Sequence, residues 1–288
     1  MPSSEQTLRW LSRPYDFLRA CAQEHGKTFT LDLGVHGQHV LFSDPEDVRA
    51  IFTASAAALH AGKGNGILAP LLGEHSLLLL EEARHLRDRR LLLPAFHAKH
   101  VARFADLVDT VARSASGTLS AGVGLHEVLQ RISLGVITRV VFGDARGGAA
   151  DELGETLGRF LDDPRFNLAL IGRLREENAE HPAFQALQRL LARVHELVRS
   201  EIARARRSGT GEEGSIVELL LLARDEGGAG LSDEEIQDEL LTMVVTGHET
   251  TATAMAWAIT WLGRHPHALA RLRGELSSMP SRDPLSVA

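Results

Sequence analysis

The sequence predicts a mainly α-helical protein with one small β-hairpin near its N-terminus. Residues 232–263 form one stretch with helical character, which at about 1.5 Å per residue gives a helix of roughly 45 Å. Apolar residues recur at helical spacing through most of residues 80–277. Only residues 27–43 change to the alternating pattern that is typical of strands.

The composition is that of a folded globular protein, and we expect one domain over residues 1–288. Apolar residues make up 44% of the chain and charged residues 24%. The net charge of −7 argues against a nucleic-acid partner. The N-terminal residues lack the apolar core of a signal peptide, so a cytoplasmic location without a membrane anchor is expected. The single cysteine, Cys21, excludes an internal disulfide and is expected to be a small buried hydrophobe.

The first elements in chain order are short. Residues 8–25 carry apolar side chains at helical spacing and predict one or two helices. Residues 27–43 predict a two-stranded hairpin, and Asp44 with Pro45 caps and starts a helix that continues to Phe52. A hairpin alone is marginally stable, and the rest of the sequence offers no convincing partner strand.

Residues 60–80 predict a loop rich in glycine and leucine. An apolar loop of this kind can form the wall of a hydrophobic pocket. It can equally be an ordinary buried connection, and the sequence leaves both interpretations open.

Residues 81–93 predict a short helix that is crowded with basic side chains. His85 and Arg89 are four residues apart and therefore share one face of it, which is the spacing needed to hold one anion. A solvated charged face is the usual alternative for such a run, and it stays open.

Four helices are expected over residues 97–207, because apolar residues recur there every three or four positions. The last of them covers about residues 184–202, and it follows an irregular segment, residues 162–182. A short helix over residues 216–222 precedes the long one, and another over residues 266–276 follows it.

The long helix has recognisable ends. Ser232 is a good N-cap, and Glu235 completes a capping box with it. Gly263 can take the left-handed position that ends a helix, and Pro266 prevents continuation. The second half of the helix is apolar nearly all round, which predicts that it is buried.

The centre of this helix, residues 246–251, has the sequence Thr-Gly-His-Glu-Thr-Thr. A glycine in mid-helix costs about 1 kcal/mol relative to alanine, and a buried carboxylate costs more unless it is paired. Thr250 can also donate back to the carbonyl of Thr246 and bend the helix. Unfavourable choices gathered at one place indicate a site. We expect Gly247 to make room for a small or flat group, beside which a hydroxyl and Glu249 supply a proton path.

Three other interpretations of this centre were considered. A kinked core helix, whose polar groups meet water or a neighbour, stays open. A membrane span is disfavoured because His248 and Glu249 interrupt the apolar run. A zinc site of the His-Glu-x-x-His type fails because its second histidine would fall on Ala252.

The motif in residues 246–251 resembles the oxygen-activation motif of the cytochrome P450 family, which is a small residue, Gly, any residue, an acid and Thr. Thr246 departs from the usual Ala or Gly but is still small. Residues 81–96 resemble the helix of this family that holds a heme propionate, with a histidine, a base four residues later and Pro-x-Phe beyond. The hairpin, this helix and the long helix also follow one another in the family's order.

The resemblance implies a heme-dependent monooxygenase that hydroxylates an apolar small molecule with O2 and with electrons from a ferredoxin or a flavoprotein. It assigns the proton relay to Thr250 and Glu249, cofactor contacts to Thr246 and Gly247, and the heme propionate to His85 and Arg89. The other arginines near Arg89 would form part of a basic face for an acidic electron donor. Residues 162–182 would form a lid over the substrate.

The family's Glu-x-x-Arg helix and the cysteine loop that ligates heme iron do not follow the long helix, and Cys21 stands too early to replace that cysteine. We therefore expect the N-terminal part of such an enzyme, truncated before the proximal side of the heme and without a metal ligand of its own. A non-catalytic helical remnant of the family is the alternative. A hydrolase that uses His248 and Glu249 is disfavoured, because adjacent helical side chains point about 100° apart.

Overall fold

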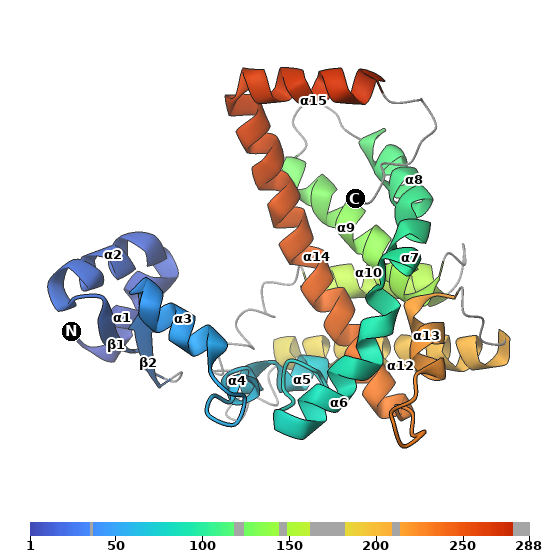
Figure 1. Cartoon of the computed structure of the whole chain (residues 1–288), viewed down its shortest axis with the longest axis horizontal. Helices are drawn as coiled ribbons and strands as arrows, with labels where there is room; N and C mark the ends of the chain where they lie inside the picture. The colour runs from blue at the N-terminus through green and yellow to red at the C-terminus, as the bar shows by residue number, and fades with distance from the viewer. Residues whose placement is uncertain (35–36, 118–123, 144–148, 162–181, 209–213, 279–288) are drawn as a thin grey trace.

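The computed structural model is mainly helical with one two-stranded antiparallel sheet among its described residues, as the sequence predicts (Figure 1). The structure describes residues 1–34, 37–117, 124–143, 149–161, 182–208 and 214–278.

The N-terminal elements form a small unit at one side of the molecule (blue in Figure 1). They are α1 (Ser3–Ser12), α2 (Pro14–His25), β1 (Thr28–Asp32), β2 (Gln38–Phe42) and α3 (Pro45–Thr53). The predicted hairpin and cap are confirmed: β1 pairs with β2, and the side chain of Asp44 accepts from the amide of Glu46 at 2.9 Å. Cys21 is 7% exposed and packs in a cluster with Phe17 and Phe29, as expected for a small hydrophobe.

The segment expected to be a loop over residues 60–80 begins with three short helices. They are α4 (Ala61–Gly64), η2 (Gly66–Leu68) and α5 (Ala69–Leu72). Residues 73–80 then lead into the basic helix α6 (Glu82–Leu92), which is followed by η3 (Leu93–Phe96), α7 (Ala98–Val101) and η4 (Ala102–Phe104). Leu71 and Leu72 are buried, so this part of the segment is a buried connection.

The remaining elements are all helices. They are α8 (Ala105–Ser116), α9 (Leu125–Phe142), α10 (Ala149–Leu161), α12 (Pro182–Ser208), α13 (Ile216–Leu222), α14 (Asp233–Arg264) and α15 (Pro266–Ser278). The bounds of α13 match the prediction. The irregular segment expected over residues 162–182 lies outside the described residues except for Pro182.

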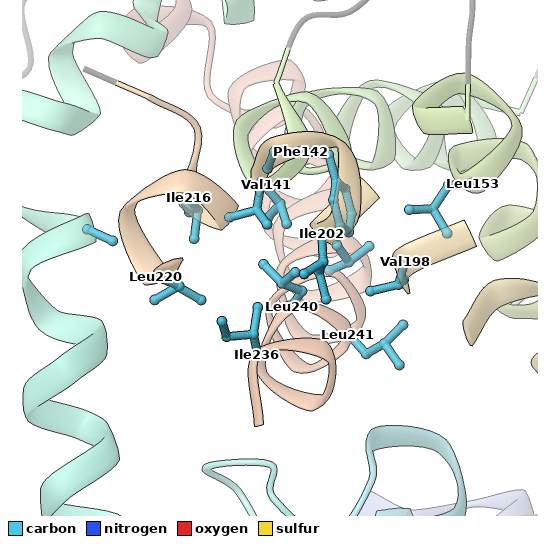
Figure 2. Packing of buried hydrophobic residues seen from close by; sticks show 14 of the residues in the cluster. Val141, Phe142, Leu153, Val198, Ile202, Ile216, Leu220, Ile236, Leu240 and Leu241 are labelled. Atoms are coloured by element: carbon cyan, nitrogen blue, oxygen red, sulfur yellow. The ribbon is translucent and has the colours of Figure 1, made fainter. Parts of the chain in front are cut away.

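The main core forms around the first half of α14. Ile236, Leu240 and Leu241 of this helix are fully buried. Figure 2 shows them beside residues of α9, α12 and α13, namely Val141, Phe142, Val198, Ile202, Ile216 and Leu220. Each such side chain contributes about 1.5–3 kcal/mol when it is removed from water, so this packing fixes the position of α14 within the helical body.

The start of α14 is as predicted, and its end is not. The hydroxyl of Ser232 accepts from the amide of Glu235 at 3.1 Å, and the carboxylate of Glu235 accepts from the amide of Ser232 at 2.7 Å. The helix continues through Gly263 to Arg264 and ends at His265. Pro266 then begins α15 directly, which crosses the end of α14 in Figure 1.

The second half of α14 is exposed, so the expectation that it is buried is wrong. Ala252 is the last buried residue of the helix. Trp257 is 58% exposed, Ile259 43% and Trp261 55%. The prediction failed because apolar composition shows only that a helix can be buried, whereas the described core around α9, α12 and α13 covers its first half and centre.

Gly73 is required by a close approach between residues 73–80 and α14. Its φ is +80°, and a Cβ on it would lie 2.1 Å from Cγ of Asp238. Gly73→Ala therefore combines a left-handed backbone, which costs about 1–2 kcal/mol, with displacement of a buried carboxylate. We expect it to lower the free energy of unfolding by about 3 kcal/mol in urea titrations.

Gly228→Ala is the matched control for this prediction. Gly228 also has a φ of +80°, but nothing lies within 4 Å of its Cβ position. The free energy of unfolding of the Gly228→Ala variant should fall only by the backbone contribution of about 1–2 kcal/mol. Equal losses in the two variants would contradict the close approach of Gly73 to Asp238.

Candidate functional site

A ladder of threonine hydroxyls runs along one face of α14. The hydroxyl of Thr250 donates to the carbonyl of Thr246 at 2.6 Å, which confirms the predicted back-bond. The hydroxyl of Thr246 donates in the same way to the carbonyl of Thr242 at 2.6 Å. The hydroxyl of Thr242 lies 2.7 Å from the carbonyl of Asp238. Each hydroxyl that donates along the helix keeps oxygen lone pairs that can accept from a ligand or water.

The carboxylate of Glu249 lies at the surface, with its side chain 54% exposed. Nε2 of Gln130 in α9 donates to its Oε2 at 2.9 Å, and Nε2 of His126 lies 3.4 Å from its Oε1. The hydroxyl of Thr253 donates to Oε1 at 3.3 Å. The carboxylate is thus held from two helices and still meets solvent, as a group that exchanges protons with water must.

One face of α9 forms hydrogen bonds with the centre of α14. The hydroxyl of Ser133 lies 2.8 Å from the carbonyl of His248 and 3.2 Å from that of Gly247. His126, Gln130 and Ser133 are spaced by four and three residues, which places them on one face. The sequence does not single out these three residues, because their spacing shows that they share a face but not which helix that face contacts.

Gly247 allows α9 and α14 to approach closely. A Cβ at this position would lie 3.2 Å from Cδ1 and from Cγ1 of Ile137 in α9. The space left by the missing side chain is therefore filled by a neighbouring helix. A contact between the backbone of Gly247 and a cofactor stays a prediction.

His248 is 3% exposed and lies at the edge of a cavity of about 1160 Å3 between α9 and α10. The carboxylate of Glu249 meets His126 and Gln130 instead. This arrangement does not favour the hydrolase alternative. Neither Thr246 nor Thr250 lines this larger cavity.

A second cavity, of about 300 Å3, lies between α6 and α14, and we call it the α6–α14 cavity. Its polar lining comes from Arg89, Glu239, Thr242 and Thr246. Its apolar lining comes from Leu77, Leu78, Leu92, Leu93, Phe96 and Met243. Within residues 60–80, which were predicted to be a loop, Leu77 and Leu78 thus form part of a pocket wall, while Leu71 and Leu72 belong to a buried connection. Both interpretations that the sequence left open are correct for different residues.

The α6–α14 cavity brings together two site residues predicted from separate motifs. Arg89 comes from the proposed anion-binding helix and Thr246 from the centre of α14. His85 is half-buried one turn before Arg89 and is not among the lining residues. The predicted shared grip of His85 and Arg89 on one anion stays a prediction.

The residues of the α6–α14 cavity fit one edge of a heme. Apolar walls suit the flat macrocycle, and the guanidinium of Arg89 suits a carboxylate. Cys21 lies in the N-terminal cluster, where burial raises the pKa of its thiol, and it does not line this cavity. Over the described part of the chain, no group of three or more His, Cys, Asp and Glu side chains is placed to hold a metal ion.

Arg87, one of the arginines expected in a basic face for an electron donor, is engaged by groups of this chain. Its guanidinium donates to Asp225 at 3.0 Å, to Asp88 at 2.8 Å and to the carbonyl of Gly230 at 3.0 Å. The hydrogen bond to Asp225 is the main cause that raises the pKa of Arg87. This side chain therefore ties α6 to the segment before α14. Arg90 is exposed and lies 3.5 Å from Glu226, so it can still contribute to such a face.

Three buried carboxyl groups lie next to this network. Asp88 and Glu239 are each 1% exposed, and Asp238 is 7% exposed. Burial is the main cause that raises the pKa of Glu239 to about 8. A hydrogen bond from the backbone amide of Leu77 lowers this pKa, whereas repulsion from Asp88, Asp238 and Glu235 raises it further. Burial also raises the pKa of Asp238, and it raises that of Asp88 despite the attraction of Arg87. The burial of Glu239 was not predicted, because it depends on which helix packs beside α14.

Comparison with known proteins identifies the family. The sequence profile of the family described as Cytochrome P450 matches residues 6–284. A protein named cytochrome P450 135B1 from Mycobacterium tuberculosis is 32% identical over 288 residues, which cover 99% of this chain and 60% of that protein. Cytochrome P450 137 from the same organism is 33% identical over 263 residues, which cover 88% and 54%. The chain belongs to the cytochrome P450 family.

Solved structures show the same fold. Retinoic acid-bound cyanobacterial CYP120A1 superposes with a TM-score of 0.79 at 22% identity, over 95% of this chain and 61% of that one. The heme domain of cytochrome P450DA superposes with a TM-score of 0.72 at 24% identity, over 92% and 59%. The chain thus spans about 60% of the length of these relatives. None of the helices within its described ranges has the length and apolar character needed to cross a membrane.

The raised pKa of Glu239 predicts that stability falls as pH rises. The ordinary pKa of glutamate is 4.5 and that of Glu239 in the folded chain is about 8, so between these values the folded state holds the extra proton. The free energy of unfolding should therefore fall across this window, by on the order of 1 kcal/mol per pH unit. Asp88 and Asp238 act in the same direction.

Glu239→Gln stays neutral at every pH and should flatten this slope. Urea titrations between about pH 5 and pH 8.5 measure it. Glu234→Gln, on the exposed side of the same helix, is the control. An unchanged slope in Glu239→Gln would show that other groups cause the pH dependence.

Proposed function

We propose that this chain contributes the oxygen-side part of a heme-dependent monooxygenase that hydroxylates an apolar small molecule. The observation that carries the proposal is the shared lining of the α6–α14 cavity by Arg89 and Thr246. Membership of the cytochrome P450 family supports it. In this proposal O2 is the oxidant, and a ferredoxin or a flavoprotein supplies the electrons.

The binding roles follow from the charges and surfaces of the cavity. Arg89 would hold a heme propionate, with His85 one turn away as its partner, while Thr246 and Gly247 would lie beside the macrocycle. The heme supplies the iron at which oxygen and electrons react. The apolar side chains of the cavity, among them Leu77 and Leu92, would exclude water from this region.

Thr250 and Glu249 would move protons. The hydroxyl of Thr250 donates to the carbonyl of Thr246, and rotation about χ1 can redirect the proton, since threonine uses two rotamers in a helix. Glu249 reaches solvent and can collect a proton there. We assign Glu249 to proton uptake and Oγ1 of Thr250 to holding the proton or water nearest the oxygen site.

The substrate and the redox partner are proposed only as chemical classes. The leucine-rich wall of residues 77–80 suits a lipid-like, fatty or terpenoid molecule. The solved structure of CYP120A1 holds retinoic acid, a carboxylic acid with a long apolar chain, which agrees with this class. An acidic donor protein would meet exposed basic groups such as Arg90. The cytoplasmic location stays a prediction.

Thr250→Ala should separate electron consumption from product formation in the complete enzyme. Without the hydroxyl, the rate of proton delivery should fall about 100-fold or more, and the electrons should reduce O2 to hydrogen peroxide. The measurement is the yield of product and peroxide per electron pair, with Thr250→Ser expected to retain coupling.

Thr260→Ala is the matched control for this experiment. Thr260 makes the same type of back-bond, to the carbonyl of Ala256 at 2.8 Å, but lies away from the motif. Its coupling should match that of the unsubstituted enzyme. Full coupling in Thr250→Ala would refute the role of the hydroxyl and favour the non-catalytic alternative for this motif.

Arg89→Gln should weaken heme binding by about tenfold, because a charge-assisted hydrogen bond to a carboxylate is lost. His85→Ala should weaken it less, since this side chain does not line the cavity. The heme content of purified variants and their rates of heme loss measure both effects. Arg90→Gln is the control, as Arg90 lies next to Arg89 but is 71% exposed and faces Glu226.

A further inference from the structure

We propose that Glu239 is a second, uncharged hydrogen-bond donor to the carboxylate that Arg89 binds in the α6–α14 cavity. The inference rests on the proposed function for the position of the heme and adds a residue to that site. Neither the family motifs nor the sequence analysis assigns Glu239 a role.

Glu239 lines this cavity and carries a buried polar atom without a partner. The residue is 1% exposed and lines the cavity together with Arg89. Its Oε1 has no hydrogen-bond partner among the described residues. A buried polar atom without a partner costs about 1–3 kcal/mol, which a ligand can recover. Glu239, Thr242 and Thr246 are three and four residues apart and share one face of α14.

The surroundings of Glu239 keep its carboxyl group protonated at neutral pH. Asp88 faces it from α6, and Glu235 and Asp238 from its own helix, while the amide of Leu77 opposes them. Arg87, which pairs with Asp88 of this cluster, is engaged by Asp225 as well. With a pKa of about 8, Glu239 is mostly a carboxylic acid below that pH. In this form its O–H can donate to a carboxylate, whereas the ionised form repels one.

The ligand chemistry is a carboxylate on a large apolar body. Arg89, an exposed residue, supplies a positive charge and Glu239 a neutral donor, and leucine side chains line the same cavity. A heme propionate and the carboxylate of a fatty-acid-like substrate share this chemistry. The experiment must therefore separate these two sources.

The test is the binding of hemin, hemin dimethyl ester and laurate to the full chain at about pH 7 and pH 9.5. Glu239→Gln, Glu239→Leu and Arg89→Gln are compared with the unsubstituted chain. We expect hemin affinity of the unsubstituted chain to fall about tenfold at the higher pH, as the donor becomes an anion. Glu239→Gln keeps an amide donor, so it should bind normally at pH 7 and lose the pH dependence. Glu239→Leu should bind with one affinity at both pH values, about tenfold more weakly than the unsubstituted chain binds at pH 7.

The esterified hemin and laurate identify the group that Glu239 contacts. Hemin dimethyl ester has no propionate charge, so its affinity should change little with pH. A pH dependence found for laurate and not for hemin would support the donor role and assign the carboxylate to the substrate. An equal fall for hemin and its ester would overturn direct contact, because ionisation would then act by disturbing the cavity.

Failure of this inference and failure of the proposed function give different results. If hemin affinity depends on pH equally in Glu239→Gln and in the unsubstituted chain, Glu239 is not the donor and the inference is wrong. If hemin and laurate bind equally well with and without the Arg89 guanidinium, neither carboxylate lies in this cavity. The heme position in the proposed function then fails independently of Glu239.

Discussion

The packing of the first half of α14 against α9, α12 and α13 is the contact on which the rest of the structure depends. Ile236, Leu240 and Leu241 fill the core from one side of the helix. Because a helix has opposite faces, fixing this side turns Glu239 and Thr246 toward α6. One helix therefore builds the core and one wall of the candidate site, and neither can shift without the other.

Buried charge is the second constraint, and it acts on the segment that joins α5 to α6. Asp238 accepts from the backbone amide of His75 at 3.0 Å, and the hydroxyl of Thr242 lies 2.7 Å from that of Ser76. These contacts hold residues 73–80 against α14, so that Leu77 and Leu78 become a cavity wall. The low-dielectric surroundings that make the acids costly also strengthen each hydrogen bond they form. The wall of the cavity is thus ordered by the same acids that have raised pKa values.

The sequence predicted local features well and contacts between helices poorly. The capping box of Ser232 and the back-bond of Thr250 depend only on residues three or four positions away, and both are confirmed. Arg89 and Thr246 were each singled out through a short motif, and they line one cavity, while their contact with a cofactor stays a prediction. The burial of Glu239 and the hydrogen bond between Ser133 and the carbonyl of His248 depend on which helix packs beside α14. No spacing within one helix encodes that choice, and the exposed Trp257 shows the same failure in the opposite direction.

Gly247 shows how this packing reaches the proposed chemistry. Its missing side chain lets Ile137 approach, and the separation of α9 from α14 is set at this point. That separation brings Gln130 within 2.9 Å of Glu249 and Ser133 within 2.8 Å of the carbonyl of His248. A larger residue here would push α9 away and release the carboxylate of Glu249 from its helix-to-helix contact. The glycine of the motif therefore acts on the proposed proton path through the distance between two helices, in addition to any direct contact with a cofactor.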